Sequence, residues 1–185
     1  MGSNYKMTYN VDLVFCIDAT ASMDGLLDMV KQNALTFHQD LMDAMAAKSK
    51  TINQLRIRIV AFRDYKYDGE DAMLTTDFFL MPQEQDLFEQ CIREIEAKGG
   101  GDDPEDGLEA MAYAIRSRWC EGGQGIKRRQ VIVVWTDAAT HELGFGWDEE
   151  TYPREYMVRD FNELLLRDTE VFDLVFRLRR RLQER

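Results

Sequence analysis

The sequence contains few of the residues that disulfide frameworks, zinc sites and flexible linkers require. Its 185 residues include 3 cysteines, 3 prolines and 2 histidines. An odd number of cysteines without Cys-x-x-Cys spacing argues against both a disulfide framework and a cysteine-ligated zinc site. The few prolines and a hydrophobic fraction of 45% predict a chain that folds around a substantial core.

Positive charge is also scarce. The 23 Lys and Arg residues against 34 Asp and Glu give a formal net charge of −11 at pH 7. Such a surface repels phosphate backbones and anionic lipids, so we expect neither nucleic acid nor a membrane as partner. The longest apolar runs, residues 13–17 and 131–135, are far shorter than the roughly 18 residues of a membrane-spanning helix. No run of signal-peptide length opens the sequence, and we expect a cytoplasmic protein.

The length fits one domain, since domains commonly hold about 100 to 200 residues. We interpret residues 1–10 as an N-terminal extension that a vector could have contributed, and residues 11–178 as a single domain. Residues 179–185 form a charged tail that could continue into a longer parent protein.

Continuous apolar runs that end in an aspartate are typical of central strands covered on both faces. Residues 11–18 and 129–137 show this pattern. Residues 55–65 and 73–80 favour an antiparallel hairpin, because the polar segment between them is too short for a crossover helix. Residues 170–178 are predicted to form a fifth strand.

Apolar residues spaced three and four apart predict helices at residues 26–45, 83–97, 104–118 and 154–166. Pro104 would open the third helix, where a missing amide is harmless. The resulting order predicts an α/β fold: an open, mostly parallel, Rossmann-like central sheet with one antiparallel edge hairpin strand and helices on both faces. The inward positions expected along these helices are Leu27, Val30, Ala34, Phe37, Leu41 and Met45 in the first, Leu87, Cys91 and Ile95 in the second, and Met157, Phe161 and Leu164 or Leu165 in the last.

Three polar loops follow predicted strands or precede a predicted helix, and they should meet at the carboxyl edge of the sheet. They are residues 18–22 (DATAS), residues 99–106 (GGGDDPED) and residues 136–141 (TDAATH). Hard oxygen ligands without nearby cysteine or paired histidine predict magnesium, with manganese and calcium as alternatives. For each loop taken alone, helix capping is the competing interpretation. The candidate ligands are Asp18, Thr20 and Ser22 in the first loop, Asp102 and Asp103 in the second, and Asp137 in the third.

Two further residues lie near these loops in the sequence. His141 could contact a bound partner or a water beside the ion, but a hydrogen bond that stabilises its loop is the favoured interpretation. Asp64, in the segment FRDY, could anchor the hairpin or the metal loops through hydrogen bonds, and a structural role is favoured for it.

The three motifs together resemble the metal-ion-dependent adhesion site of von Willebrand factor type A (vWA) domains. DATASM is similar to the family's DxSxS signature, and GGGDDPEDGLEA and WTDAATH are similar to its second and third metal loops. The forms FRDY, GGGDDPED and DAATH resemble the branch found in alpha-kinase-associated and hemicentin-like proteins. This resemblance implies a metal-binding, non-catalytic module that binds a protein partner through a magnesium-centred site, where the partner offers a carboxylate or another oxygen.

Carried over to this sequence, the resemblance places Asp18, Thr20 and Ser22 in the first loop and Asp137 in the third. The threonine of the family's second loop falls at Asp102. Asp18 and Asp137 alone would neutralise a divalent ion, whereas a third carboxylate makes the site −1. We therefore expect firm metal binding and weak binding of an acidic ligand.

Two other functions share some of these features. A magnesium-dependent phosphatase or phosphotransferase of the haloacid dehalogenase type also has an aspartate at the end of its first parallel strand, but it needs a second acid where Thr20 stands. A structural α/β domain with a decayed motif would show no magnesium dependence. The family's sheet also continues beyond five strands, so an uncovered C-terminal edge could pair with a neighbouring domain or a second copy.

Overall fold

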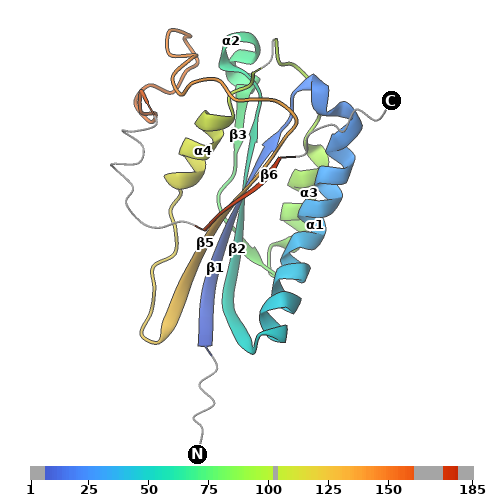
Figure 1. The fold of residues 1–185 in the computed structure, drawn as a ribbon, viewed down its shortest axis with the longest axis vertical. Helices are drawn as coiled ribbons and strands as arrows, with labels where there is room; N and C mark the ends of the chain where they lie inside the picture. Colours follow the sequence, from blue (N-terminus) through green and yellow to red (C-terminus); the bar gives the residue numbers. More distant parts are fainter. Residues whose placement is uncertain (1–6, 102–103, 161–172, 179–185) are drawn as a thin grey trace, which may run out of the picture.

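The structure, a computed structural model, describes residues 7–101, 104–160 and the strand 173–178. A six-stranded sheet forms its centre (Figure 1). The strand β1 (Met7–Asp18) lies between β2 (Lys50–Phe62) and β5 (Ile126–Thr136), and it is parallel to both. The edge strand β6 (Asp173–Leu178) is parallel to β5, whereas β3 (Met73–Thr75) and β4 (Phe79–Met81) are antiparallel to β2.

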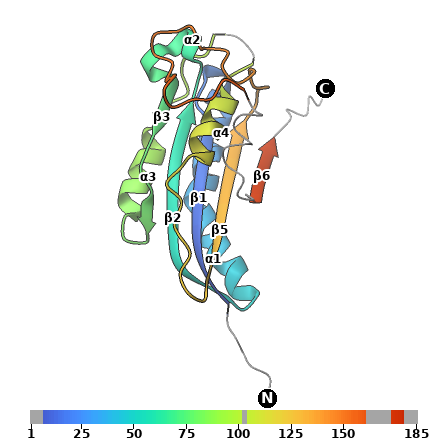
Figure 2. The same cartoon turned by 90° about the vertical axis from the view of Figure 1, so that its left-hand side faces the viewer.

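Helices cover both faces of this sheet. Figure 2 shows α4 (Gly107–Ile115) in front of the strands and α1 (Asp24–Ala47) behind them. The helix α3 (Gln85–Glu94) contributes to the same core cluster as α1. Three one-turn segments at the loops complete the described elements: η1 (Ala21–Met23), α2 (Tyr65–Asp68) and η2 (Gly69–Ala72).

Alternation along the strands divides the core into two layers, because successive side chains of a strand point to opposite faces. On β1, Leu13, Phe15 and Ile17 pack in the layer of α1 and α3. Val14 and Cys16 pack in the layer of α4. Both sets are fully buried, which explains why the central strand reads as a continuous apolar run.

The predicted α/β class and the mostly parallel sheet are confirmed. The predicted return strand 73–80 is wrong in one respect, because it is divided into β3 and β4. At the break, the Thr76 hydroxyl accepts the Ile59 amide at 3.0 Å, and the Arg58 guanidinium donates to the Thr76 carbonyl at 2.8 Å. Side chains thus replace part of the backbone ladder. The segment before β3 forms α2 and η2 rather than a simple turn.

The predicted start of the helix at Pro104 is also wrong, since α4 begins at Gly107. Glu105 pairs with Thr140 in a β-bridge instead, where the Glu105 amide donates to the Ala139 carbonyl at 3.0 Å and its carbonyl accepts the His141 amide at 2.8 Å. Residues committed to this bridge cannot also form the first helical turn.

The buried stripe of α3 differs from the prediction. Leu87 is 56% exposed, whereas Phe88 and Ile92 are fully buried. The reason is the aromatic contact of Phe88, whose ring centroid lies 6.2 Å from that of Phe15 and 6.0 Å from that of Phe79. Cys91 is half-buried and Ile95 is buried.

The predicted last helix, 154–166, is wrong over its described part, because residues 154–160 form turns. Arg154 holds these turns by donating to the carbonyls of Trp147 at 2.7 Å and Glu149 at 2.8 Å. Met157 is buried as predicted. The inward positions Phe161, Leu164 and Leu165 lie outside the described residues. Among the described residues, no helix has the length and hydropathy that crossing a bilayer demands.

The sequence patterns missed a buried ion pair on β1. Asp12 is fully buried and accepts from Arg56 Nε at 2.8 Å and Nη2 at 2.7 Å. It also accepts the Cys120 amide at 2.6 Å. This bidentate pair joins β1 to β2 and ties down the segment that follows α4, because removing either partner would leave a buried polar group unsatisfied.

Replacing Asp12 with alanine is therefore expected to lower the free energy of unfolding by about 3 kcal/mol. The cost is below that of a fully buried pair because the Arg56 side chain keeps 22% exposure. Urea unfolding of Asp12→Ala measures it, with the exposed Asp77→Ala as the matched control. A loss within the range of that control would show that the pair contributes nothing.

Candidate metal centre

The first loop gathers three oxygens directly after β1. The Thr20 hydroxyl donates to Asp18 Oδ1 at 2.6 Å and lies 3.1 Å from Ser22 Oγ. The Thr20 amide also donates to Asp18 Oδ1, at 3.0 Å. Spacing by two residues at the start of η1 thus turns all three side chains toward one point.

The third loop brings a second carboxylate to this point. Parallel pairing of β1 and β5 sets Ile17 opposite Trp135, so both strands end at the same edge. Asp137 follows β5, and its Oδ1 accepts the Ser22 hydroxyl at 3.0 Å. The structure therefore brings the oxygens of Asp18, Thr20 and Ser22 together with that of Asp137, which lies 115 residues after Ser22 in the sequence.

Thr136, which the sequence interpretation did not single out, holds the other oxygen of Asp18. Its hydroxyl donates to Asp18 Oδ2 at 2.7 Å. It also accepts the amide of Ala138 at 3.1 Å. The residue therefore fixes both the Asp18 carboxylate and the turn that carries Asp137.

Burial disfavours the charged form of the Asp18 side chain. Asp18 is fully buried, and this desolvation raises its pKa above the ordinary value. The hydrogen bonds from Thr20 and Thr136 oppose the shift, whereas the charge of Asp137 adds to it. A cation beside the two carboxylates would offset this cost.

The second loop approaches the first closely. The Ala21 amide donates to the Gly99 carbonyl at 3.1 Å, and the Lys98 amide donates to the Ala19 carbonyl at 3.0 Å. Gly100 has φ of +74°, and a Cβ there would lie 3.1 Å from the Cβ of Thr20. Glycine is thus needed for the loops to touch. Asp102 and Asp103 lie outside the described residues, so the structure does not place these two candidate ligands.

Arg63 connects the first loop to two neighbouring segments of the chain. Its guanidinium donates to the carbonyls of Ala19 at 3.0 Å, Asp71 at 2.7 Å and Glu96 at 2.9 Å. The side chain is 7% exposed. These three bonds hold the first loop, η2 and the segment that leads into the second loop in one arrangement.

Two of the residues singled out in the sequence, Asp64 and His141, lie in a separate buried cluster with Asp106. His141 Nδ1 lies 3.2 Å from Asp106 Oδ1 and 3.7 Å from Asp64 Oδ2. The remaining carboxylate oxygens accept backbone amides: Asp64 Oδ1 that of Lys66 and Asp106 Oδ2 that of Tyr65, each at 2.7 Å. One ligand atom from each member lies within 4.8 Å of the others, so this group could also hold a metal ion.

The two groups differ in donor chemistry. The Asp18 group offers oxygens alone, which suit magnesium, whereas a histidine nitrogen suits zinc and other transition metals. The hydrogen bonds of the Asp64–Asp106–His141 cluster join α2, the start of α4 and the third loop. The His141 ring also stacks on Phe145, with centroids 3.8 Å apart. Contacts of this kind stabilise loops without any ion.

Glu109, on the first turn of α4, anchors the segment after the third loop. Its Oε1 accepts the Gly144 amide at 2.8 Å and the Tyr152 hydroxyl at 3.0 Å. Burial, followed by the charge of Asp106, raises the pKa of Glu109 to about 7. The sequence did not predict this buried carboxyl group, because the helix was expected to begin at Pro104 and no inward positions were assigned to it.

Comparison with known proteins identifies the family. The family model of the von Willebrand factor A domain matches residues 12–143. This chain belongs to the von Willebrand factor A family. The vWA match covers β1 to the third loop, the part of the chain that contains both clusters. Domains of this family are generally protein-interaction modules and typically non-catalytic, and they often bind a divalent metal.

Two relatives carry a similar vWA segment within much longer chains. An ariadne-like RING finger protein, R811 of Acanthamoeba polyphaga mimivirus, is 26% identical over 165 residues, which are 89% of this chain and 14% of that protein. The alpha-protein kinase vwkA of Dictyostelium discoideum is 24% identical over 143 residues, 77% of this chain and 21% of the kinase. This chain therefore spans only a small part of either relative.

Solved structures agree on the fold. The pilus adhesin SpaC of Lactobacillus rhamnosus GG superposes with a TM-score of 0.53 at 12% sequence identity, over 73% of this chain and 16% of the adhesin. Its open conformation gives the same score and identity over 15% of the adhesin. At this identity the likeness concerns the fold alone.

The pKa of Glu109 leads to a test of pH dependence. The folded state favours the protonated carboxyl, whose pKa in the unfolded chain is about 4.3. Its stabilising contribution is complete below that value and is lost as the pH rises through about 7. Glu109→Gln avoids this loss, so at pH 8 it should be more stable than the wild type by about 3 to 4 kcal/mol.

Urea unfolding between pH 4.5 and 8 measures this difference, with the exposed Glu121→Gln as control. We expect the advantage of Glu109→Gln to shrink as the pH falls. Parallel pH profiles for the wild type and Glu109→Gln would show that the carboxyl does not titrate in this range.

Proposed function

We propose that this vWA domain binds a protein partner through a magnesium-centred site formed by Asp18, Thr20, Ser22 and Asp137. The observation that carries the proposal is the convergence of these side chains from two loops. Their hydrogen-bonded oxygens lie 2.6 to 3.1 Å apart. Neighbouring ligands of an octahedral magnesium ion lie about 2.9 Å apart, since each lies about 2.1 Å from the metal. The donor set therefore fits the ion.

Each residue has a distinct role in this proposal. Asp18 and Asp137 supply the negative charge, and the hydroxyls of Thr20 and Ser22 add neutral oxygen ligands. When bound, the ion would offer positive charge and a coordination position to an oxygen of the partner. Thr136 orients the Asp18 carboxylate through its hydrogen bond, and such outer partners of metal ligands commonly affect affinity about 10- to 100-fold.

Manganese and calcium are alternative occupants, because both also take oxygen ligands. Asp102 or Asp103 remains the proposed ligand from the second loop. We further propose that the partner contributes a carboxylate or another oxygen, that no nucleic acid or membrane is bound, and that the protein acts in the cytoplasm. The acidic composition supports the exclusion of nucleic acid.

Phosphoryl transfer has less support. Thr20 occupies the position where the haloacid dehalogenase arrangement needs an acidic residue. Its hydroxyl group donates a hydrogen bond to Asp18. We propose that the domain is not an enzyme. Hydrolysis of p-nitrophenyl phosphate that disappears in Asp18→Asn would favour the phosphatase instead.

Asp18→Asn should weaken magnesium binding at least about tenfold, because it removes a charged ligand while preserving the side-chain volume. Isothermal titration with magnesium and manganese measures the affinity. The control is Asp28→Asn, which changes an exposed carboxylate on α1 and should bind like the wild type. Magnesium should also raise the unfolding temperature of the wild type and the control, because an ion that binds only the folded state stabilises it.

The interaction itself is tested with the same proteins as bait in lysate of the source cell. Partners should be retained by the wild type and by Asp28→Asn in magnesium, and lost in EDTA or with Asp18→Asn. Unchanged affinity for both ions in Asp18→Asn would contradict the metal site. Metal binding without any metal-dependent partner would contradict the interaction.

A further inference from the structure

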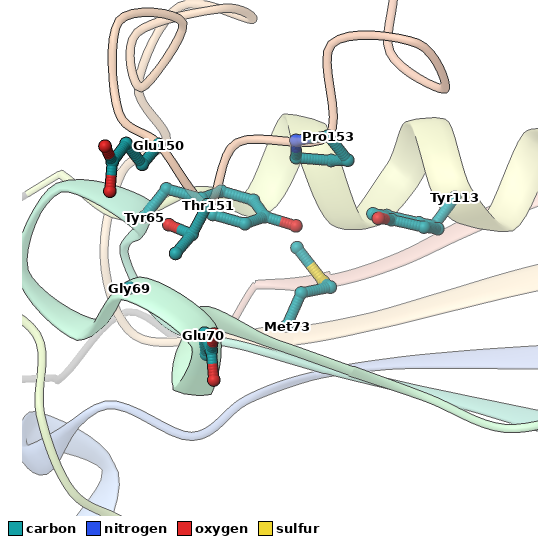
Figure 3. A pocket seen from close by; sticks show the side chains of 8 residues that line it. All are labelled: Tyr65, Gly69, Glu70, Met73, Tyr113, Glu150, Thr151 and Pro153. Carbon is teal, nitrogen blue, oxygen red and sulfur yellow. The ribbon is translucent and has the colours of Figure 1, made fainter.

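A pocket of about 510 Å³ opens on the face of the sheet that α4 covers. Figure 3 shows its lining: Tyr65, Gly69 and Glu70 come from α2 and η2, Met73 from β3, Tyr113 from α4, and Glu150, Thr151 and Pro153 from the segment after the third loop. None of these residues is a proposed metal ligand. The pocket lies beside the carboxyl end of β2, because α2 follows that strand directly.

The charge of the lining is entirely negative. Glu70 and Glu150 are both exposed, and the lining includes no Lys, Arg or His. Within the described parts of the chain, neither carboxylate has an ion-pair or side-chain hydrogen-bond partner. In Figure 3 both carboxylates lie toward the Gly69 end, whereas Tyr113 lies at the opposite end. The two charges therefore lie at the rim of the pocket, where they attract a cation.

Uncharged residues form the rest of the wall, among them the aromatic Tyr65 and Tyr113 and the thioether Met73. Tyr65 is 5% exposed, and Figure 3 shows its hydroxyl group directed toward Tyr113. Burial raises the pKa of Tyr113, so its phenol stays neutral at physiological pH. The Tyr65 ring packs edge-on against the Tyr152 ring, with centroids 5.1 Å apart. The aromatic wall is therefore held in place before any ligand arrives.

We propose that this pocket binds an arginine side chain of a protein partner. A guanidinium group is planar, stacks on aromatic rings and donates hydrogen bonds to carboxylates, which matches the half-buried Tyr113 ring and the two carboxylates at the rim. The net charge of −11 would attract such a basic partner over a longer range. An anionic ligand would be repelled by both carboxylates.

This inference goes beyond the proposed metal-dependent function, since its residues are separate from Asp18, Thr20, Ser22 and Asp137. A partner that used both sites would present an acidic group to the metal and an arginine to the pocket. The two proposals can be tested separately. Arginine binding is measured in EDTA, which removes divalent metal, so its result does not depend on the proposed metal site.

The probe is acetyl-arginine amide, added in EDTA to protein labelled with ¹³C at its methionine methyl groups. The Met73 methyl resonance, assigned with Met73→Leu, should shift saturably. Acetyl-citrulline amide, which has nearly the same shape and no charge, should bind at least about fivefold more weakly, because it forms no ion pair.

The double variant Glu70→Gln/Glu150→Gln should lose at least about fivefold in affinity for acetyl-arginine amide for the same reason. Both positions are exposed, so the fold should be unaffected, and unchanged shifts of the other methionines would verify this. The control Glu155→Gln changes an exposed carboxylate outside the lining and should bind like the wild type. Equal affinity for citrulline, unchanged affinity in the double variant or no Met73 shift would overturn the proposal.

Discussion

The structure depends on a buried carboxylate at the end of its central strand. Asp18 is fully buried, and two hydroxyl groups and a backbone amide donate to it. Burial nevertheless raises its pKa, so the hydrogen bonds alone do not compensate the loss of water. The nearby Asp137 makes the local charge more negative. A cation beside the two carboxylates would reduce this cost, and the proposed metal-dependent function rests on that.

The loops around Asp18 are rigidly connected to the rest of the fold. Arg63 joins the first loop to η2 and to the segment before the second loop, and its own carbonyl accepts the Asp106 amide at 3.2 Å. Asp106 in turn contacts His141 in the third loop. A continuous set of hydrogen bonds therefore links the oxygen site to the buried Asp64–Asp106–His141 cluster. This network connects the loops at the carboxyl edge of the sheet.

Much of the fold could be predicted because the central strands are covered on both faces. Continuous apolar runs located β1 and β5, and their terminal aspartates located one edge of the site. The beginning of α4 could not be predicted, because the bridge between Glu105 and Thr140 pairs residues distant in sequence. The buried stripe of α3 was misplaced for a similar reason, since the contacts of Phe88 with Phe15 and Phe79 outweigh local spacing.

The sequence predicted that Asp18, Thr20, Ser22 and Asp137 converge, but it did not predict the residues that support them. Thr136, Arg63 and Asp106 lie within the segments TDAATH, FRDY and GGGDDPED, but the sequence assigned no role to them, because their partners come close only in the fold. A threonine before the terminal aspartate of a strand, or an arginine after a buried strand, could be flagged as a candidate partner of the loops. Only the folded structure gives the distances that show which of these candidates contact the loops.

The most direct measurement of the central claim is anomalous diffraction from crystals of the protein soaked in manganese. We predict an anomalous peak from a manganese ion that oxygens of Asp18, Ser22 and Asp137 coordinate. A peak among Asp64, Asp106 and His141 with none at Asp18 would contradict it, and so would the absence of any peak at saturating manganese.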